Sequence, residues 1–286
     1  MGTNGSAYLG GGYGELPKYR AGLALNNRKG KFNFTGGLNY NRNSYLNRLT
    51  LSRVVLDQDF DQFSYDENES DSYSARLGLD YDLNDRHRLG FNARTTVSQR
   101  SQTSTSQTNI FNRLTGEQQA GFATDGLESG SRTSFSTDAF YRWKIDTSGQ
   151  EVTLDGSYSN FSRDNTITLI TNGDLSILRR NQEPALIDLF TSQIDYKRPI
   201  GKTLRFEAGV KYSSVKLDNE LLAELSNGAV FENDPNLSNK FLYDENIAAA
   251  YGQFYYEKEG LEIVAGLRLK ALKPPGTTSP LTQSIP

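Results

Sequence analysis

The sequence predicts an all-β protein, namely an antiparallel transmembrane β-barrel that is present only in part. Two observations carry this prediction. Apolar and polar residues alternate in one segment after another, and short turns alternate with long polar stretches along the chain. A third observation, the spacing of aromatic residues on one face, supports the same fold class.

The alternation has a period of two, which is the periodicity of a strand and not of a helix. In the segment 31–42, for example, Phe32, Leu38 and Tyr40 share one face while Asn33 and Asn39 share the other. Eleven strands of this kind are expected. They lie near 5–13, 18–27, 31–42, 71–82, 88–98, 132–145, 151–162, 187–197, 203–215, 246–256 and 261–270.

The connections between these strands differ in length in a regular way. Short turns are expected at 27–30, 83–87, 146–149, 198–202 and 257–260. Long polar loops are expected at 44–70, 99–131, 163–186 and 216–245. Transmembrane barrels have short periplasmic turns at one rim and long extracellular loops at the other. We therefore expect the turns to face the periplasm and the long stretches to contact the ligand.

Aromatic residues mark both ends of several predicted strands. Three pairs lie eight residues apart on the apolar face: Phe32 and Tyr40, Tyr73 and Tyr81, and Phe135 and Trp143. Eight residues of a tilted strand rise roughly 20 Å, close to the apolar band that two aromatic girdles flank in a barrel. These six residues are the predicted aromatic girdle.

The strand count indicates part of a larger barrel. Bacterial barrels have an even number of strands, and eleven is half of the ~22 strands found in plugged outer-membrane transporters. Residues 1–270 are expected to form a partial barrel domain. Residues 271–286 include Pro274-Pro275, which cannot extend a central strand, so we expect a disordered tail there.

Composition excludes several classes of protein. The chain is 36% hydrophobic and 11% aromatic, with a net charge of -3 that suggests no nucleic-acid surface. It has no cysteine and one histidine, so we expect neither an enzyme nor a cofactor. No apolar run reaches the ~18 residues of a spanning helix. Residues 2–5 are no signal peptide, so the chain is expected to be soluble or to lack its native start.

Several segments resemble a known family once they are read in order. The segment from Gly10 to Phe34 resembles the early barrel of an outer-membrane β-barrel family of Bacteroidota, whose members look like TonB-dependent receptors. The segments 77–85, 207–212, 245–251 and 265–269 are similar to the same family. The resemblance implies a place in the Gram-negative outer membrane and binding and uptake of a ligand, which the sequence does not name. It also implies a plug domain and a TonB-type coupling protein as partners in the parent protein.

Three local motifs admit a chemical interpretation beside a structural one. Asp57, Asp59 and Asp61 could hold calcium through hard oxygen ligands, but the EF-hand pattern fails and a solvated acidic loop is favoured. His87 could serve a rim active site, although its place in a short turn favours a surface histidine. The glycines of 10–14 could suggest a nucleotide loop, but no helix-forming stretch follows them.

Charged residues recur on the polar face of the predicted strands. The lumen-facing set is expected to include Arg76, Asp80, Arg94, Arg142, Arg205, Glu207 and Arg268. These charges would line a wet lumen or contact a plug. They could equally be the solvated face of a one-sided sheet.

Two other classes of function stay open at this point. The chain could belong to a structural or adhesive surface protein without a transport role. An outer-membrane enzyme is the third class, and one histidine without cysteine leaves it little chemistry.

Overall fold

The computed structural model describes residues 2–173 and 176–273, and these form one antiparallel sheet of 13 strands. The strands are β1 Gly2–Tyr13, β2 Pro17–Lys29, β3 Phe32–Val55, β4 Gln58–Asp82, β5 His87–Asn112, β6 Gln118–Lys144, β7 Glu151–Asn172, β8 Ile177–Gln182, β9 Ala185–Ile200, β10 Leu204–Ser226, β11 Phe231–Asn233, β12 Asn239–Lys258 and β13 Leu261–Lys273. In this part of the chain, no helix has the length and apolar character needed to cross a membrane.

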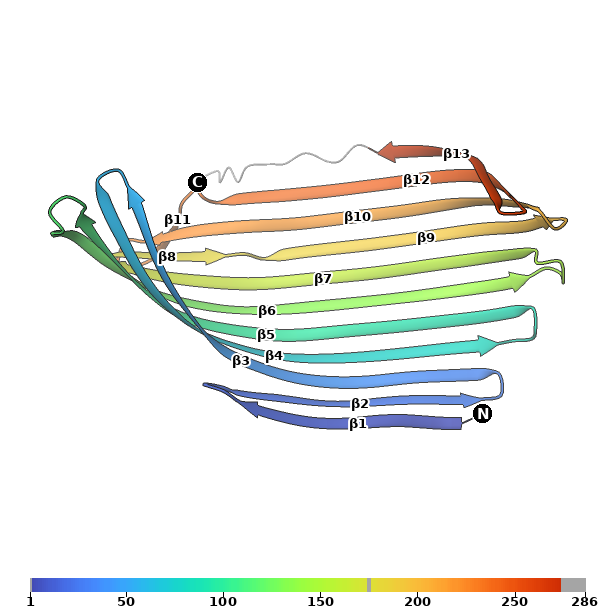
Figure 1. Ribbon diagram of the computed structural model, residues 1–286, viewed down its shortest axis with the longest axis horizontal. Coiled ribbons are helices and arrows are strands. Elements are labelled where there is room, and N and C mark those ends of the chain that lie inside the picture. The colour runs from blue at the N-terminus through green and yellow to red at the C-terminus, as the bar shows by residue number, and fades with distance from the viewer. Residues whose placement is uncertain (1, 174–175, 274–286) are drawn as a thin grey trace.

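Neighbours in sequence are neighbours in the sheet, so the order is that of an up-and-down meander (Figure 1). β8 and β9 occupy one position between β7 and β10. Their registers with β7 are continuous, since Gln182 pairs with Thr166 and Ala185 pairs with Arg163. Pro184 interrupts them because it has no amide hydrogen to donate to the ladder. Each of the eleven predicted strands thus has its counterpart, and β11 is a short addition beside β10.

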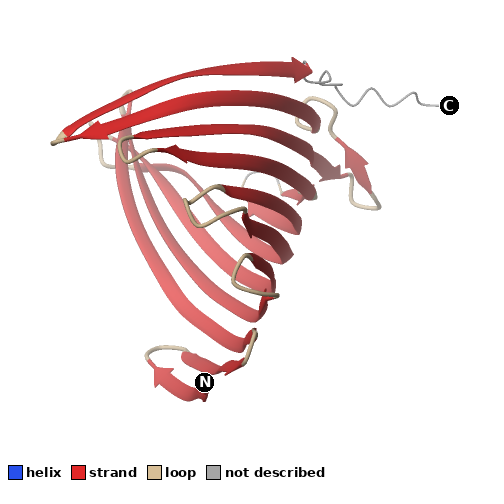
Figure 2. Ribbon diagram, turned by 90° about the vertical axis from the view of Figure 1, so that its right-hand side faces the viewer, coloured by secondary structure: helices blue, strands red, loops and turns tan. Residues whose placement is uncertain are grey.

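The sheet curves strongly about an axis along its strands, as expected for part of a barrel wall (Figure 2). Within the described residues, β1 and β13 are the two ends of the strand order and do not pair with each other. The short turns are where the sequence predicts them, at 30–31, 83–86, 145–150, 201–203 and 259–260. These five connections define the turn end of the sheet, and the opposite end is called the far end.

The prediction of long loops at the far end is wrong. The stretch 44–70 forms the outer parts of β3 and β4, joined by a tight turn at 56–57. The stretch 99–131 likewise belongs to β5 and β6, whose connection spans 113–117. In 163–186 and 216–245, too, most of the described residues are in strands. The far ends of β3 to β6 project beyond their neighbours and bend away from the body of the sheet (Figure 1).

In β5, the reason for the error is the loss of the hydrophobic stripe. β5 carries Gln, Ser and Thr on both faces between Gln99 and Thr108, yet these residues pair with β4 and β6 without a break. Where both faces of a strand meet water, the period-two signal disappears while the backbone ladder continues. A membrane-crossing strand needs only about 9–11 residues, whereas β6 has 27.

Candidate functional site: the concave face

The register of the strands places the seven predicted lumen residues on a single face. Arg76 pairs with Arg94, and from Arg142 one row runs through Thr153, Asp195, Gly209 and Tyr251 to Arg268. This face is hollowed, as the pocket lined by Arg76 and Arg94 shows, and it is called the concave face. That it lines a lumen stays a prediction.

The opposite, convex face carries the six residues of the predicted girdle. The aromatic pairs form across strands: Phe32 stacks on Tyr81 with ring centres 4.2 Å apart, and Tyr40 lies 5.0 Å from Tyr73. Cross-strand aromatic pairs of this kind stabilise an antiparallel sheet. Apolar side chains such as Leu38 (59% exposed) lie open on the same face, as in a wall that faces lipid.

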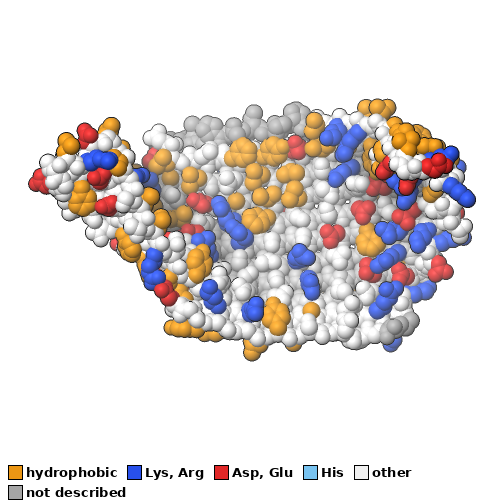
Figure 3. Space-filling model, viewed as in Figure 1, with side chains coloured by type: hydrophobic (Ala, Val, Ile, Leu, Met, Phe, Trp, Pro, Cys, Tyr) orange, Lys and Arg blue, Asp and Glu red, His pale blue; other side chains and the backbone are white. Residues whose placement is uncertain are grey.

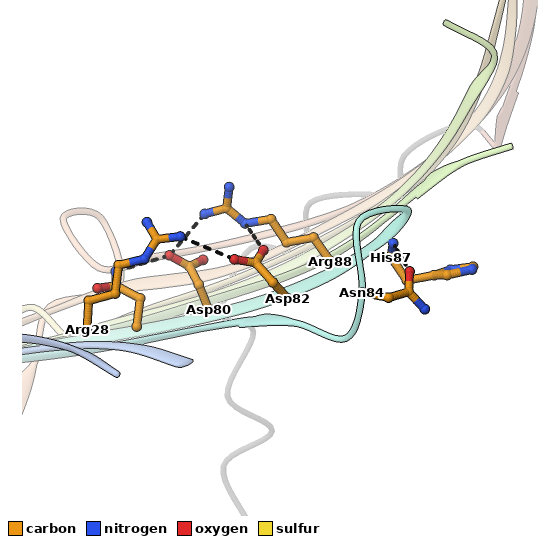
Figure 4. Close-up of polar contacts among 7 residues, drawn as sticks. Arg28, Asp80, Asp82, Asn84, His87 and Arg88 are labelled. Carbon is orange, nitrogen blue, oxygen red and sulfur yellow. Dashed lines mark hydrogen bonds and ion pairs between the residues drawn. The ribbon is translucent and has the colours of Figure 1, made fainter. Parts of the chain in front are cut away.

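Ion pairs gather at the turn end of the concave face. Arg88 reaches Asp80 at 3.2 Å and Asp82 at 3.6 Å, and Arg28 reaches Asp82 at 3.4 Å (Figure 4). Asn84 closes the β4–β5 turn, because its side-chain oxygen accepts hydrogen bonds from the backbone amides of Arg86 and His87. This Asx arrangement fixes the direction of the turn.

His87 begins β5 and points away from the ion pairs (Figure 4). Its Nδ1 lies 2.6 Å from the Tyr141 hydroxyl, and its ring stacks at 5.9 Å on both Tyr141 and Trp143. The histidine is therefore part of an aromatic cluster on the convex face at the turn end. This position supports the structural interpretation of His87.

A second polar cluster bridges three strands over Gly209. The Tyr251 hydroxyl on β12 donates a hydrogen bond to Asp195 on β9, although β10 lies between them. This is possible because Gly209 has no side chain: a Cβ there would lie 2.2 Å from Asp195 Oδ1 and 2.5 Å from Tyr251 Cε1. Nearby, Arg205 pairs with Glu207 at 2.8 Å.

The middle of the concave face has a hollow with a volume of about 720 Å³. Strands β1 to β6 supply its lining, which includes Arg76, Arg94 and Asp138 with the amides of Asn26 and Asn92. Gly37 makes room for Arg76, since a Cβ at Gly37 would lie 2.8 Å from Arg76 Nε. Figure 3 shows Lys and Arg side chains isolated among uncharged groups in the middle of this face, whereas both signs of charge gather at its right-hand end, the turn end.

At the far end, a buried carboxylate ties β8 to β10. Glu224 is 8% exposed and accepts hydrogen bonds from Arg180 Nε at 2.6 Å and Gln182 at 3.1 Å. The hydrogen bond from Arg180 holds the pKa of Glu224 below its ordinary value, against the opposing effect of burial. Arg180 also lies over the Phe231 ring at 4.1 Å.

The three aspartates considered for calcium do not converge. Asp57 lies in the β3–β4 turn, Asp59 approaches Arg113 at 3.7 Å, and Asp61 accepts a hydrogen bond from Ser52 at 2.6 Å. Among residues 2–173 and 176–273, no group of three or more candidate ligands is arranged to hold a metal ion.

Two features of the concave face escape the sequence pattern. Arg100 lies on it beyond the hollow, in the stretch 99–131 that the pattern marks as a loop, beside Arg132 at the start of the predicted strand 132–145. The bridging over Gly209 depends on residues from three strands, and no local signal connects them. An inward glycine opposite a large polar residue is the one hint that the sequence offers.

Comparison with known proteins supports the fold. Residues 143–283, just under half of the chain, match the model of the outer membrane protein beta-barrel family. Comparison with curated protein sequences gives no match.

Solved structures with a similar arrangement are outer-membrane barrels. The translocator domain of the autotransporter NalP from Neisseria meningitidis is 13% identical, with 94% of this chain and 83% of that chain covered and a TM-score of 0.29. The RagAB peptide importer is 9% identical, with 90% of this chain and 44% of that chain covered and a TM-score of 0.37. The siderophore receptor PiuA from Acinetobacter baumannii is 8% identical, with 89% of this chain and 48% of that chain covered and a TM-score of 0.32. The chain thus spans about half the length of the last two, and likeness at this level identifies no ligand.

The curved antiparallel sheet and the family match define the class, an outer-membrane β-barrel protein. It is therefore located in the outer membrane, with the bilayer as its surroundings.

Proposed function

We propose that the protein binds a ligand outside the cell and takes it up across the outer membrane, in the manner of TonB-dependent receptors. The observation that carries the proposal is the difference between the two faces of one curved sheet. The convex face presents apolar and aromatic side chains, and the concave face presents charges around a hollow of about 720 Å³. A barrel wall needs one face for lipid and one for a wet interior.

The projecting ends of β3 to β6 take the place of the predicted ligand-contacting loops in this proposal. They extend the concave face past the thickness of a bilayer, so a ligand would meet this wall before it enters the barrel. A plug domain would close the interior and a TonB-type protein would supply energy. The protein performs no covalent chemistry in this scheme, and it needs no cofactor.

The orientation can be tested directly because the chain has no cysteine. Leu56, 91% exposed in the β3–β4 turn, and Asp85, exposed in the β4–β5 turn, mark the two ends. In whole cells, a membrane-impermeant maleimide should label L56C, and it should label D85C only after the outer membrane is opened. The reverse pattern, or equal labelling of both variants, would contradict the orientation.

Uptake needs its own measurement. Cells that express the whole protein should accumulate its ligand, and a protonophore should abolish the accumulation while leaving binding at the surface. A structural or adhesive surface protein is the alternative. Its removal would reduce attachment to surfaces or to other cells without any change in uptake.

A further inference from the structure

Two arginines face each other at the centre of the concave face. Arg76 on β4 and Arg94 on β5 are direct cross-strand partners, and both are exposed in the central hollow. Within residues 2–173 and 176–273, neither guanidinium forms an ion pair with a carboxylate or a hydrogen bond to another side chain. Like charges directly opposite each other destabilise a sheet. An anion between them would remove this repulsion.

At the turn end of the concave face, in contrast, an arginine is paired with carboxylates. Arg88 lies on the same strand and face as Arg94, six residues away, and it is paired with both Asp80 and Asp82. Asp80 is two positions from Asp82 on β4, and the next inward positions toward the far end are Gly78 and then Arg76. On β4, the inward carboxylates thus end at Asp80, before the hollow, and the next charged inward residue is Arg76.

The hollow has the shape and chemistry to hold a charged group. Its lining supplies neutral hydrogen-bonding side chains from several strands, among them Asn4, Asn26, Asn92 and Ser136. Asp138 is the one carboxylate in that lining, against two arginines, so the hollow carries a net positive charge. The guanidinium of Arg76 lies over Gly37, where a larger residue would collide with it.

Further cations continue from the hollow toward the far end. Arg100 lies six residues beyond Arg94 on the same face of β5, a distance of roughly 20 Å along the strand. Its guanidinium donates hydrogen bonds to the neutral side chains of Asn68, at 2.9 Å, and Gln102, at 2.7 Å. Arg132 on β6 lies over the Phe161 ring at 5.5 Å. Glu128 is the inward acid nearest to them on β6.

We propose that Arg76 and Arg94 form a binding site for a small ligand with two or more phosphate or carboxylate groups, and that Arg100 and Arg132 mark its path from the far end. Guanidinium groups bind both kinds of anion through two parallel hydrogen bonds. The path rests on the proposed uptake, because it assumes entry from outside the cell. The site itself needs only the geometry of the concave face.

The test is a calorimetric titration of the protein, extracted from outer membranes in detergent, with tripolyphosphate at low salt. Tripolyphosphate should bind, and Arg76→Gln or Arg94→Gln should each weaken binding about tenfold, the effect of one lost charged hydrogen-bonding group. The neutral sugar maltotriose should not bind. Arg113→Gln is the matched control, since it removes the same charge from the β5–β6 connection, far from the hollow.

Three results would overturn the site. The first is a wild-type protein that does not bind tripolyphosphate, as expected if an acidic segment of a plug occupies the arginines. The second is an equal loss of affinity in R113Q, which would indicate general charge attraction. The third is an R76Q/R94Q protein that inserts correctly and binds tripolyphosphate as the wild type does. None of these results depends on uptake, and the cysteine labelling reports the orientation separately.

Discussion

At the scale of single residues, glycine decides which side chains on the concave face can meet. Gly209 is the clearest case, because two polar residues from non-adjacent strands form their hydrogen bond across it. Gly90 is a second, since a Cβ there would lie 2.0 Å from the Phe140 ring. Glycine is generally unfavourable inside a strand, but these two glycines provide the space that the neighbouring side chains need. Their role is set by the neighbouring strand, and it cannot be recognised from the glycine alone.

Replacing Gly209 by alanine should separate Tyr251 from Asp195. The new Cβ meets both side chains and also lies 2.9 Å from the Ile194 carbonyl oxygen, which cannot move without disturbing the ladder. We expect a loss of about 1–3 kcal/mol in unfolding free energy, as in other overpacked sites. The measurement is a urea denaturation midpoint in detergent micelles.

Gly156→Ala is the matched control, because a Cβ at Gly156 on β7 has no atom within 4 Å. Its effect should stay within about 0.5 kcal/mol. Equal stability of the G209A protein and the wild type would show that the bridge over Gly209 contributes nothing to the sheet.

At the scale of elements, the sequence predicts the strands where one face is apolar and fails where both faces are wet. Each of the eleven segments that alternate coincides with a strand, three of them extending one residue beyond it, and the turn end is found to within a few residues. The far part of β5 is missed because Ser, Thr and Gln on both faces leave only the backbone ladder to define the strand. The division of charged residues between faces follows from alternation alone. Which residues meet across strands depends on register, as the pairing of Arg76 with Arg94 does.

Contact between β8 and β10 should depend on pH through Glu224. Arg180 lowers the pKa of this carboxyl group, so the ionised form stabilises the folded far end. That stabilisation is complete above the ordinary glutamate pKa of about 4.3 and is lost as the pH falls through the lowered value. Hydrogen exchange of the β8 amides, corrected for intrinsic rates, should therefore show increased opening below about pH 4.

Two variants define this effect. Glu224→Gln should remove most of the pH dependence and increase opening already at neutral pH, because Arg180 loses its charged partner. Glu232→Gln removes an exposed carboxylate from the neighbouring β11 and should retain the wild-type profile. If E224Q and the wild type open with the same pH dependence, another group is responsible.

At the scale of the whole molecule, the assignment of the two faces determines every functional statement. A barrel wall and a one-sided solvated sheet share the same alternation, and they differ in what the apolar face meets. Leu77 provides the decisive position. It lies on the convex face of β4, midway between Tyr73 and Tyr81, which the girdle prediction places near the two edges of the apolar band.

Leu77→Arg should therefore place a charge near the middle of the bilayer, at a cost of about 2–4 kcal/mol in the free energy of insertion. Thr96→Arg is the matched control, because Thr96 lies on the concave face of the adjacent strand β5. It should insert as the wild type does, since a wet interior solvates the added charge. Equilibrium folding into lipid vesicles, measured over a range of urea concentrations, gives both values. If L77R leaves the free energy of insertion unchanged, or if T96R reduces it by the same amount, the convex face does not meet lipid at this depth. The one-sided sheet would then be the better description.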